Sequence, residues 1–309
     1  MKAQQAKSKK NHARSGHLLA AFTVGVWGMT FISTKVLLKD FTPLQILFTR
    51  FLLGYIFLWL IRPKRLKETT KQQEFFFALA GLSGITLYYF IENMALTYTT
   101  ASNVGVVVSL APFFTALLSK WVVGGKEVGG YFYIGFAVAL SGIALISFGG
   151  LSEVALHPFG DFLGILAAFV WALYSLLSKK ISTFGHDLLL ATRRTFFYGL
   201  IFMLPLFLIT GSPLPSSTAW TGMQLFHLLF LGIGASAICF ITWNYSVKSL
   251  GAVKASVYIY AVPSITVVTS ALFLNEAFTP VVATGTLLTT MGLLLSERSS
   301  GKEKEAEVD

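Results

Sequence analysis

Long apolar runs, separated by short polar segments, occupy most of the chain. Each run is close to the about 20 residues that a helix needs to cross about 30 Å of hydrocarbon. The runs are continuously apolar and lack the alternation of β-barrel strands. The pattern predicts an all-α integral membrane fold of ten transmembrane helices. The expected spans are 17–38, 44–61, 75–96, 99–122, 131–149, 160–178, 188–210, 223–246, 252–273 and 280–296.

Basic residues predict the orientation. If ten spans alternate in direction, most of the 24 Lys and Arg residues fall on one side, and the opposite side holds only Lys39. Basic loops stay in the cytoplasm, so both termini are expected there, in a multi-pass protein of the plasma membrane. The run after His17 is too long for the core of a secretory signal, and we interpret it as a retained first helix. The segment Pro213–Trp220 is expected outside.

The composition agrees with a membrane environment. Only 12% of the residues are charged, against about 25% in soluble domains. Mean hydropathy is +0.69. The net charge of +10 is explained by topology and by contact with anionic lipid headgroups, so nucleic acid is not an expected partner. Cys239 is the single cysteine and cannot form a disulfide within the chain.

The two halves of the sequence resemble each other. Matches that keep chain order relate them at shifts of 144 to 151 residues. They pair Trp27 with Trp171, Lys35 with Lys179, Arg50 with Arg194, Asn93 with Asn244, Pro112 with Pro263, Glu127 with Glu276 and Gly142 with Gly292. Because each repeat holds five helices, an odd number, the second repeat starts from the opposite side of the membrane. The sequence therefore predicts two inverted five-helix repeats, which are typical of transporters.

These features resemble the drug/metabolite transporter superfamily, EamA type. The resemblance rests on the Trp and Lys of each first helix, the Arg of each second helix, the run Asn93–Leu96, the two prolines and the Asn-Glu pair before the last helix. The loop Gly-Gly-Lys-Glu after the fourth span and Glu92 depart from the family pattern. The resemblance implies a carrier of small metabolites, of a kind that often moves its substrate out of the cell. The expected organisation is a basic cytoplasmic tail (1–16), a first repeat (17–149), an external linker (150–159), a second repeat (160–297) and a cytoplasmic tail (298–309).

Two prolines are expected to bend the fourth and ninth spans. Each frees the carbonyl four residues earlier, at Val108 and Ile259. Such a carbonyl needs a partner or a water-lined cavity in hydrocarbon. We therefore expect Pro112 and Pro263 to border a central cavity, although a kink that is merely packed against a neighbour would look the same in sequence. Pro205 has no repeat partner and is interpreted as structural.

Charged and amide residues inside the spans supply the candidate chemistry. Glu92 is the only acid well inside a span, and it can bind a substrate amine, carry a coupled proton or simply pair locally. Arg50 can neutralise Glu92 or a helix end, or attract anions. Asn93 and Asn244 fit interhelical hydrogen bonds better than ligand contacts. Lys35 is expected to extend to the membrane surface.

Aromatic residues are the remaining cavity candidates. The chosen ones are Trp27, Trp171, Tyr174, Trp243 and Tyr260, although any single aromatic in such a chain is more often packed in the core or against lipid. No Walker A motif is present, the histidines lack metal spacing, and the glycines near 232–234 lack a strand–turn–helix context. Neither a cofactor, a metal nor a catalytic residue is expected.

Three functional hypotheses follow. The first is a secondary transporter, an exporter or facilitator, for a small organic metabolite such as an amino acid. The second is a lipid or lipid-precursor flippase, which a lateral cleft between helices would favour over a closed central cavity. The third, a membrane-embedded lipid-modifying enzyme, would need more reactive residues than Glu92 alone. The expected partners are a small-molecule substrate and membrane lipids, with a homodimer as one option.

Overall fold

The structure, a computed structural model, describes residues 2–123, 130–149, 158–213 and 221–302. Glu127, most of the linker 150–159, most of the loop Pro213–Trp220 and the end of the C-terminal tail lie outside these ranges. Every regular element within them is helical. The first half holds α1 (Lys2–Leu37), α2 (Pro43–Ile61), α3 (Lys71–Ala80), η1 (Gly81–Leu87), α4 (Tyr88–Tyr98), α5 (Ala101–Val108), α6 (Ala111–Val123) and α7 (Gly130–Gly149). The second half holds α8 (Pro158–Ser182), α9 (Leu188–Thr210), α10 (Gly222–Leu229), η3 (Phe230–Ile238), α11 (Cys239–Leu250), α12 (Ala252–Ser256), η4 (Val257–Ala261), α13 (Val262–Leu274) and α14 (Pro280–Lys302).

The helices lie where the apolar runs predict them. In the described ranges, eight are long and apolar enough to cross a membrane. The fifth and tenth runs give shorter apolar helices, Tyr133–Ile146 and Pro280–Leu295. The protein is therefore an all-helical, multi-pass membrane protein. The first helix begins at Lys2 instead of 17, because the Ala, Gln and Lys residues of the expected tail favour helix.

Capping boxes fix where several spans begin. At the start of α2, α3 and α10, a threonine side chain accepts from a backbone N–H three residues on, and a glutamine there returns the bond. Such reciprocal bonds satisfy amides that a helix start leaves without partners. The boxes Thr70–Gln73 and Thr221–Gln224 are 151 residues apart, the same shift that relates Asn93 to Asn244. The third and eighth spans thus begin in the same way.

Corresponding spans are also interrupted in the same way. The third and eighth contain π-helical segments, η1 and η3, between ordinary α-helices. The fourth and ninth are broken just before Pro112 and Pro263. The expected kinks are therefore helix breaks, in which Pro263 occupies the first turn of a new helix. A proline is tolerated there because that turn has no amide bond to lose. Both prolines are buried within the helical body.

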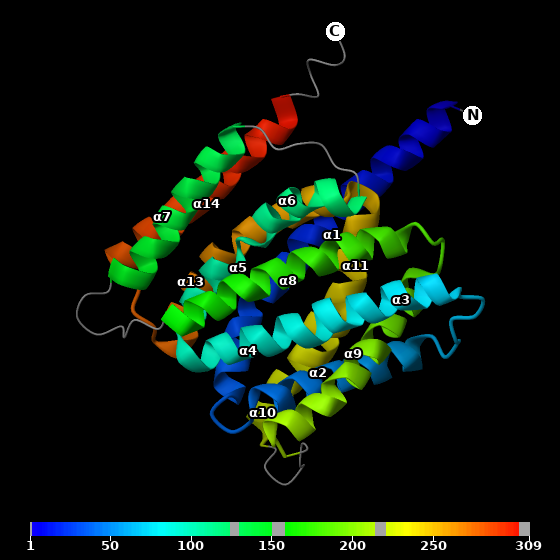
Figure 1. The fold of residues 1–309 in the computed structure, drawn as a ribbon, viewed down its shortest axis with the longest axis horizontal. Coiled ribbons are helices and arrows are strands. Elements are labelled where there is room, and N and C mark those ends of the chain that lie inside the picture. Colours follow the sequence, from blue (N-terminus) through cyan, green and yellow to red (C-terminus); the bar gives the residue numbers. More distant parts are fainter. Residues whose placement is uncertain (1, 124–129, 150–157, 214–220, 303–309) are drawn as a thin grey trace.

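The two halves pack against each other in a reciprocal pattern (Figure 1). Helix α1 packs against α11 and α13, the eighth and ninth spans. Helix α8 packs against α4 and α6, the third and fourth spans. Helices α7 and α14 pair side by side, with far fewer contacts to the other helices. Each half therefore depends on the other for most of its packing surface.

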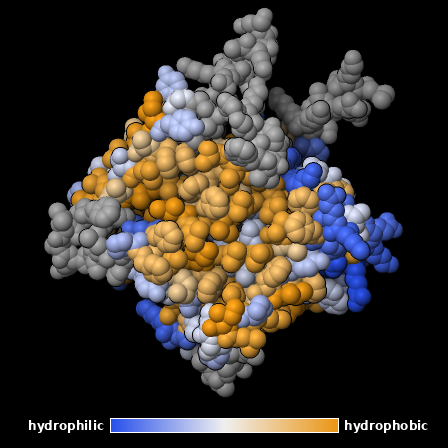
Figure 2. Space-filling view, in the orientation of Figure 1, coloured by the Kyte–Doolittle hydropathy of each residue, from blue (hydrophilic) through white to orange (hydrophobic). Residues whose placement is uncertain are grey.

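The outer surface is strongly apolar. Leu208, Ile209 and Phe273 are 87%, 78% and 71% exposed. Figure 2 shows an apolar face across the helices, with hydrophilic residues gathered toward their ends. A surface of this kind is stable only against lipid or another apolar partner.

Two lysines cap helix ends. Lys35 Nζ donates to the carbonyls of Leu96 (2.5 Å) and Thr99 (2.7 Å), and Lys179 Nζ donates to Lys248 O (3.3 Å). A cation is favourable at a helix C-terminus, where carbonyls lack partners. Lys35 therefore closes the end of α4, where the third span ends, and its extension toward the membrane surface stays a prediction.

Candidate functional site

Aromatic side chains from both halves meet inside the helical body. Trp27 on α1 and Trp171 on α8 pack edge to face, with ring centroids 5.0 Å apart. Trp243 on α11 lies 5.1 Å from Trp27 and 6.0 Å from Trp171. The other rings of this central aromatic cluster are Phe51, Tyr88, Tyr89, Tyr174, Phe196 and Phe240. Four of the aromatic residues chosen from sequence, Trp27, Trp171, Tyr174 and Trp243, thus come together in one place.

A small central cavity lies beside this cluster. Its lining residues are Trp27, Thr30, Phe31, Tyr88, Tyr89, Glu92, Val108, Trp171, Ile259 and Val262. Its volume of about 20 Å³ accommodates roughly one water molecule. Val108 and Ile259, whose carbonyls the prolines were expected to free, both line it. The site is therefore closed to a metabolite in this conformation.

Glu92 is the charged residue of the central cavity. Its side chain is 3% exposed, and Tyr88 Oη donates to Oε1 at 2.7 Å. Oε2 accepts no hydrogen bond from the described residues. A buried carboxylate with one partner is costly unless it binds a proton or a cation. Glu92 is thus suited to a proton or to a substrate amine.

Arg50 lies close to this site without pairing with Glu92. Its side chain is fully buried, and Nε donates to Ser236 Oγ at 3.0 Å on η3. The guanidinium carbon lies 4.3 Å from the ring centroid of Tyr89. Arg50 forms no ion pair with any acidic residue of the described ranges. Arg50 and Glu92 thus make no direct ion pair in this conformation, although the Arg50 charge lies near enough to act on the Glu92 carboxyl, and the neutralisation of Glu92 by Arg50 stays a prediction.

The two repeat-related asparagines make interhelical hydrogen bonds, as expected. Asn93 Nδ2 donates to Pro43 O at 3.1 Å, between α4 and α2. Asn244 Oδ1 accepts from Tyr174 Oη (2.9 Å) and Ser178 Oγ (2.7 Å), and Asn244 Nδ2 donates to Thr192 Oγ1 (3.0 Å). Asn244 therefore ties α11 to α8 and α9.

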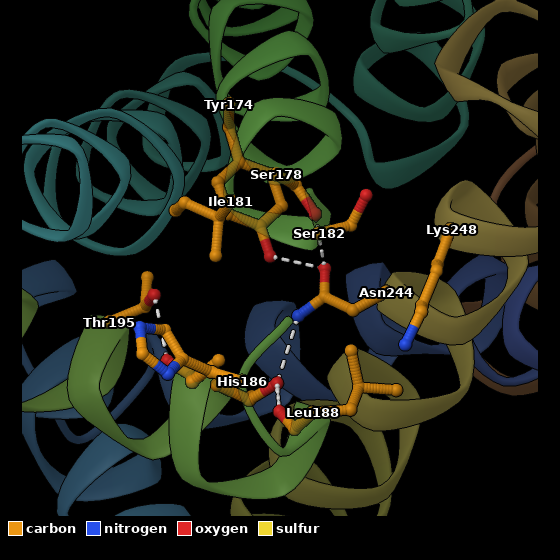
Figure 3. A pocket seen from close by; sticks show the side chains of 11 residues that line it. Tyr174, Ser178, Ile181, Ser182, His186, Leu188, Thr195, Asn244 and Lys248 are labelled. Carbon is orange, nitrogen blue, oxygen red and sulfur yellow. Dashed lines mark hydrogen bonds between the residues drawn. The ribbon is translucent and has the colours of Figure 1, made fainter. Parts of the chain in front are cut away.

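Asn244 also lines a second pocket of about 20 Å³, the Asn244 pocket (Figure 3). Tyr174, Ser178 and Lys248 contribute to its wall, and His186 lies at its edge. Tyr174 and Trp171 are neighbours on α8, with ring centroids 5.0 Å apart. Trp171 lines the central cavity and Tyr174 lines the Asn244 pocket, so the two pockets have neighbouring rings in their walls.

Polar contacts join the two halves where α4 ends and α5 begins. Glu276 Oε1 accepts from the amide of Ala101 (2.9 Å), and Oε2 accepts from the amide (3.1 Å) and Oγ (2.5 Å) of Ser102. Asn103 donates to Asp161 at the start of α8. The Glu276 carboxylate therefore caps the N-terminus of α5, where the helix dipole favours negative charge.

A lateral groove of about 740 Å³ lies between α1, η4, α13 and α14. Tyr260 lines this groove and is absent from the lining of the central cavity, where the sequence hypothesis put it. His17 and Lys254 lie in its wall, and Tyr258 Oη is 2.7 Å from His17 Nδ1. The groove is thus largely apolar, with basic groups among its lining residues.

Sequence reasoning missed three rings of the central site. Tyr88 and Tyr89 line the cavity, and Phe240 contacts the rings of Trp27, Trp171 and Tyr89. The signal was present, because the shift of 151 residues that pairs the asparagines also pairs Tyr89 with Phe240. It was overlooked since aromatic residues make up 15% of the chain.

Apolar helices around a closed central site are the arrangement expected of a membrane transporter, and the comparison with known families shows that class. The model of the EamA-like transporter family matches residues 14–148 and again 158–298. The chain therefore belongs to the EamA-like transporter family, within the drug/metabolite transporter superfamily, and the resemblance seen in the sequence is confirmed.

Relatives of similar length agree. An uncharacterized transporter of Archaeoglobus fulgidus is 31% identical, over 91% of this chain and 96% of its own. A "Probable terminal-alkyne amino-acid exporter" of Streptantibioticus cattleyicolor is 28% identical, over 74% of this chain and 75% of its own. One solved crystal structure matches with a TM-score of 0.64 at 20% identity, over 91% of this chain and 98% of that one, and shows the shared fold.

Proposed function

We propose that this transporter moves a small organic metabolite, such as an amino acid or a related compound, by alternating access at the central cavity. The observation that carries the proposal is the position of Glu92, in a cavity walled by Trp27 and Trp171, the repeat-related tryptophans. A site between two repeats can open to either side of a membrane when the repeats exchange conformations. The name of the Streptantibioticus relative favours amino-acid chemistry and export.

The proposal includes ten spans arranged as two inverted repeats, with both termini in the cytoplasm. Reciprocal packing supports the repeats, because α1 contacts the eighth and ninth spans and α8 contacts the third and fourth. The family match to two successive segments supports them as well. The basic loops support the orientation.

A transport path follows from the two pockets. Lys248 lines the Asn244 pocket, and we infer that the neighbouring rings of Trp171 and Tyr174 form the barrier between this pocket and the central cavity. We infer further that the contacts of Glu276 with the start of α5 close the other end of the path. Substrate would enter past Tyr174, occupy the central cavity after the rings repack, and leave when the Glu276 contacts open.

The test uses purified protein in proteoliposomes. Uptake of radiolabelled amino acids and related metabolites is measured against pH, with and without a proton gradient. We expect saturable uptake of at least one compound. Glu92→Gln should leave the protein folded and should remove either the pH dependence or the preference for amines. The matched control is Glu68→Gln, since Glu68 is an exposed acid outside the site.

Two results would contradict this proposal. Unchanged rate and pH profile in a folded Glu92→Gln protein would exclude a coupling or binding role for Glu92. A folded wild-type protein that carries none of the metabolites under either gradient would exclude small-metabolite transport of this kind.

The lateral groove favours a second candidate function, flipping of a lipid or lipid precursor. Its volume suits an acyl chain, and His17 and Lys254 could meet an anionic headgroup. A dithionite assay with fluorescent phosphatidylglycerol in the same proteoliposomes tests this. Loss of probe protection in the presence of the protein, with no metabolite uptake, would favour the flippase over the transporter.

A further inference from the structure

Arg50 carries a buried charge that makes no direct ion pair with an acidic residue in the described part of the chain. The residue is 0% exposed, and neither Nη1 nor Nη2 has a hydrogen-bond partner among the described residues. A guanidinium stays protonated in proteins, so this charge is permanent. Burying a charge whose donors lack acceptors is unfavourable, and a conformation in which a ligand supplies the missing acceptors would relieve that cost.

The repeat-related arginine shows what a paired guanidinium looks like in this protein. Arg194 donates from Nε to Glu74 Oε2 at 2.9 Å and from Nη2 to Glu74 Oε1 at 2.7 Å. Glu74 also accepts from Tyr198 Oη at 2.5 Å. No acid takes the place of Glu74 beside Arg50 in the described part of the chain. Equivalent positions thus hold one satisfied and one unsatisfied arginine.

Unpartnered donors lie in and next to the central aromatic cluster. Besides the two Arg50 nitrogens, the indole Nε1 atoms of Trp171 and Trp243 are buried without acceptors among the described residues. The ring of Tyr89 lies 4.3 Å from the Arg50 guanidinium carbon and also lines the cavity. This cation–π contact offsets part of the cost of burial and gives the N–H groups no acceptor. Arg50 itself does not line the cavity, so Tyr89 is a side chain through which it could reach the cavity.

We propose that the substrate carries a carboxylate, which Arg50 binds through Nη1 and Nη2 once the ring of Tyr89 turns aside. Arg and a carboxylate match as a planar, bidentate pair. Glu92 lies three residues after Tyr89 on α4, so both are on one helix face. Glu92 then receives the amino group of the same substrate. The substrate class is an α-amino acid with an apolar side chain, which the central aromatic cluster accommodates. This inference rests on the proposed transport function.

The melting temperature of the purified protein tests, without any substrate, whether Arg50 is unpaired. Purified Arg50→Met should melt at or above the wild-type temperature, because the cost of burying a charge with two unpartnered nitrogens outweighs the bond to Ser236 and the contact with Tyr89. Arg194→Met should melt about 3 °C or more lower, because it breaks a paired charge. If Arg50→Met melts as low as Arg194→Met or fails to fold, Arg50 is structural and the proposal is overturned. The proposal is also overturned if Arg50→Met lowers the melting temperature of the wild type but does not lower that of the Glu92→Gln variant, since Glu92 would then be the partner of Arg50.

Binding of four matched probes tests the substrate class. They are L-phenylalanine, L-phenylalaninamide, phenethylamine and 3-phenylpropionate, each titrated into purified protein by calorimetry. The wild type should bind the amino acid at least about tenfold more tightly than the amide or the amine. Arg50→Met should lose that preference, and Glu92→Gln should lose only the preference over 3-phenylpropionate.

The outcomes separate this inference from the proposed function. Equal wild-type affinity for the amino acid and its amide overturns the carboxylate role, and so does an unchanged preference in Arg50→Met. If none of the probes binds and the metabolite screen finds a carried compound without a carboxylate, this inference fails and the transport function stands. If no metabolite is carried at all, the transport function fails, and the melting temperatures still decide whether Arg50 is unpaired.

Discussion

Removal of the Glu276 carboxylate should loosen one end of the transporter. This group accepts three hydrogen bonds at the N-terminus of α5, from the amides of Ala101 and Ser102 and from Ser102 Oγ. Bonds to a charged group contribute about 1.5–3 kcal/mol each when isolated. The side chain is half-buried and water replaces part of the loss, so we expect Glu276→Ala to cost about 2 kcal/mol in total. That cost raises the open fraction of this end about 30-fold.

Cysteine accessibility measures this opening. Ser270 Oγ lies 2.5 Å from Ser102 Oγ behind the Glu276 contacts, and Ser270 is fully buried. Ser270→Cys is therefore labelled by a water-soluble maleimide only when this end opens. In a Cys239→Ser background, Glu276→Ala should speed labelling about 30-fold, and Glu276→Gln should have a smaller effect. Equal labelling rates with and without the carboxylate would refute the reasoning.

Two further predictions concern topology and packing. A single cysteine placed in the segment 62–71 should resist impermeant reagents applied to intact cells, and external labelling would contradict the basic-residue argument. Gly84→Ala should lower the melting temperature by about 5 °C or more, because the new Cβ would lie 2.1 Å from Cδ2 of the buried Tyr174 ring. Gly25→Ala is the control, since nothing lies within 4 Å of its added Cβ, and equal melting of the two variants would disprove the clash.

Hydropathy alone predicted most helix positions, because a membrane span has a fixed length and few charges. The repeat matches also pointed to the site. Trp27 and Trp171, paired by a shift of 144 residues, are in direct contact. Pro112 and Pro263 mark the breaks that bring Val108 and Ile259 to the cavity. These features could be predicted because each depends on residue types that are recognisable in the local sequence.

Which side chains pair with each other could not be predicted in the same way. Arg50 and Arg194 occupy matching positions, yet within the described residues Arg194 forms an ion pair and Arg50 does not, because the position that corresponds to Glu74 in the other repeat is Leu225. The π-helical segments η1 and η3 depend on the register of the backbone hydrogen bonds, and no simple amino-acid composition specifies that register. The place of Tyr260 depends on how the broken ninth span turns, and that is set by tertiary packing.

Because the two halves pack reciprocally, the first helix is synthesised long before the helices that it packs against. About 200 residues separate the end of α1 from the start of α11, one of its main contacts. A ribosome that adds about 5–20 residues per second needs roughly 10–40 s to synthesise that stretch. During this time α1 lies in the bilayer with its future contact face, including Trp27 and Thr23, turned to lipid or to an insertion factor. The nascent protein therefore has to protect its first helix until the eighth span arrives, and a ribosome stalled after the first repeat would leave that helix without its main partners.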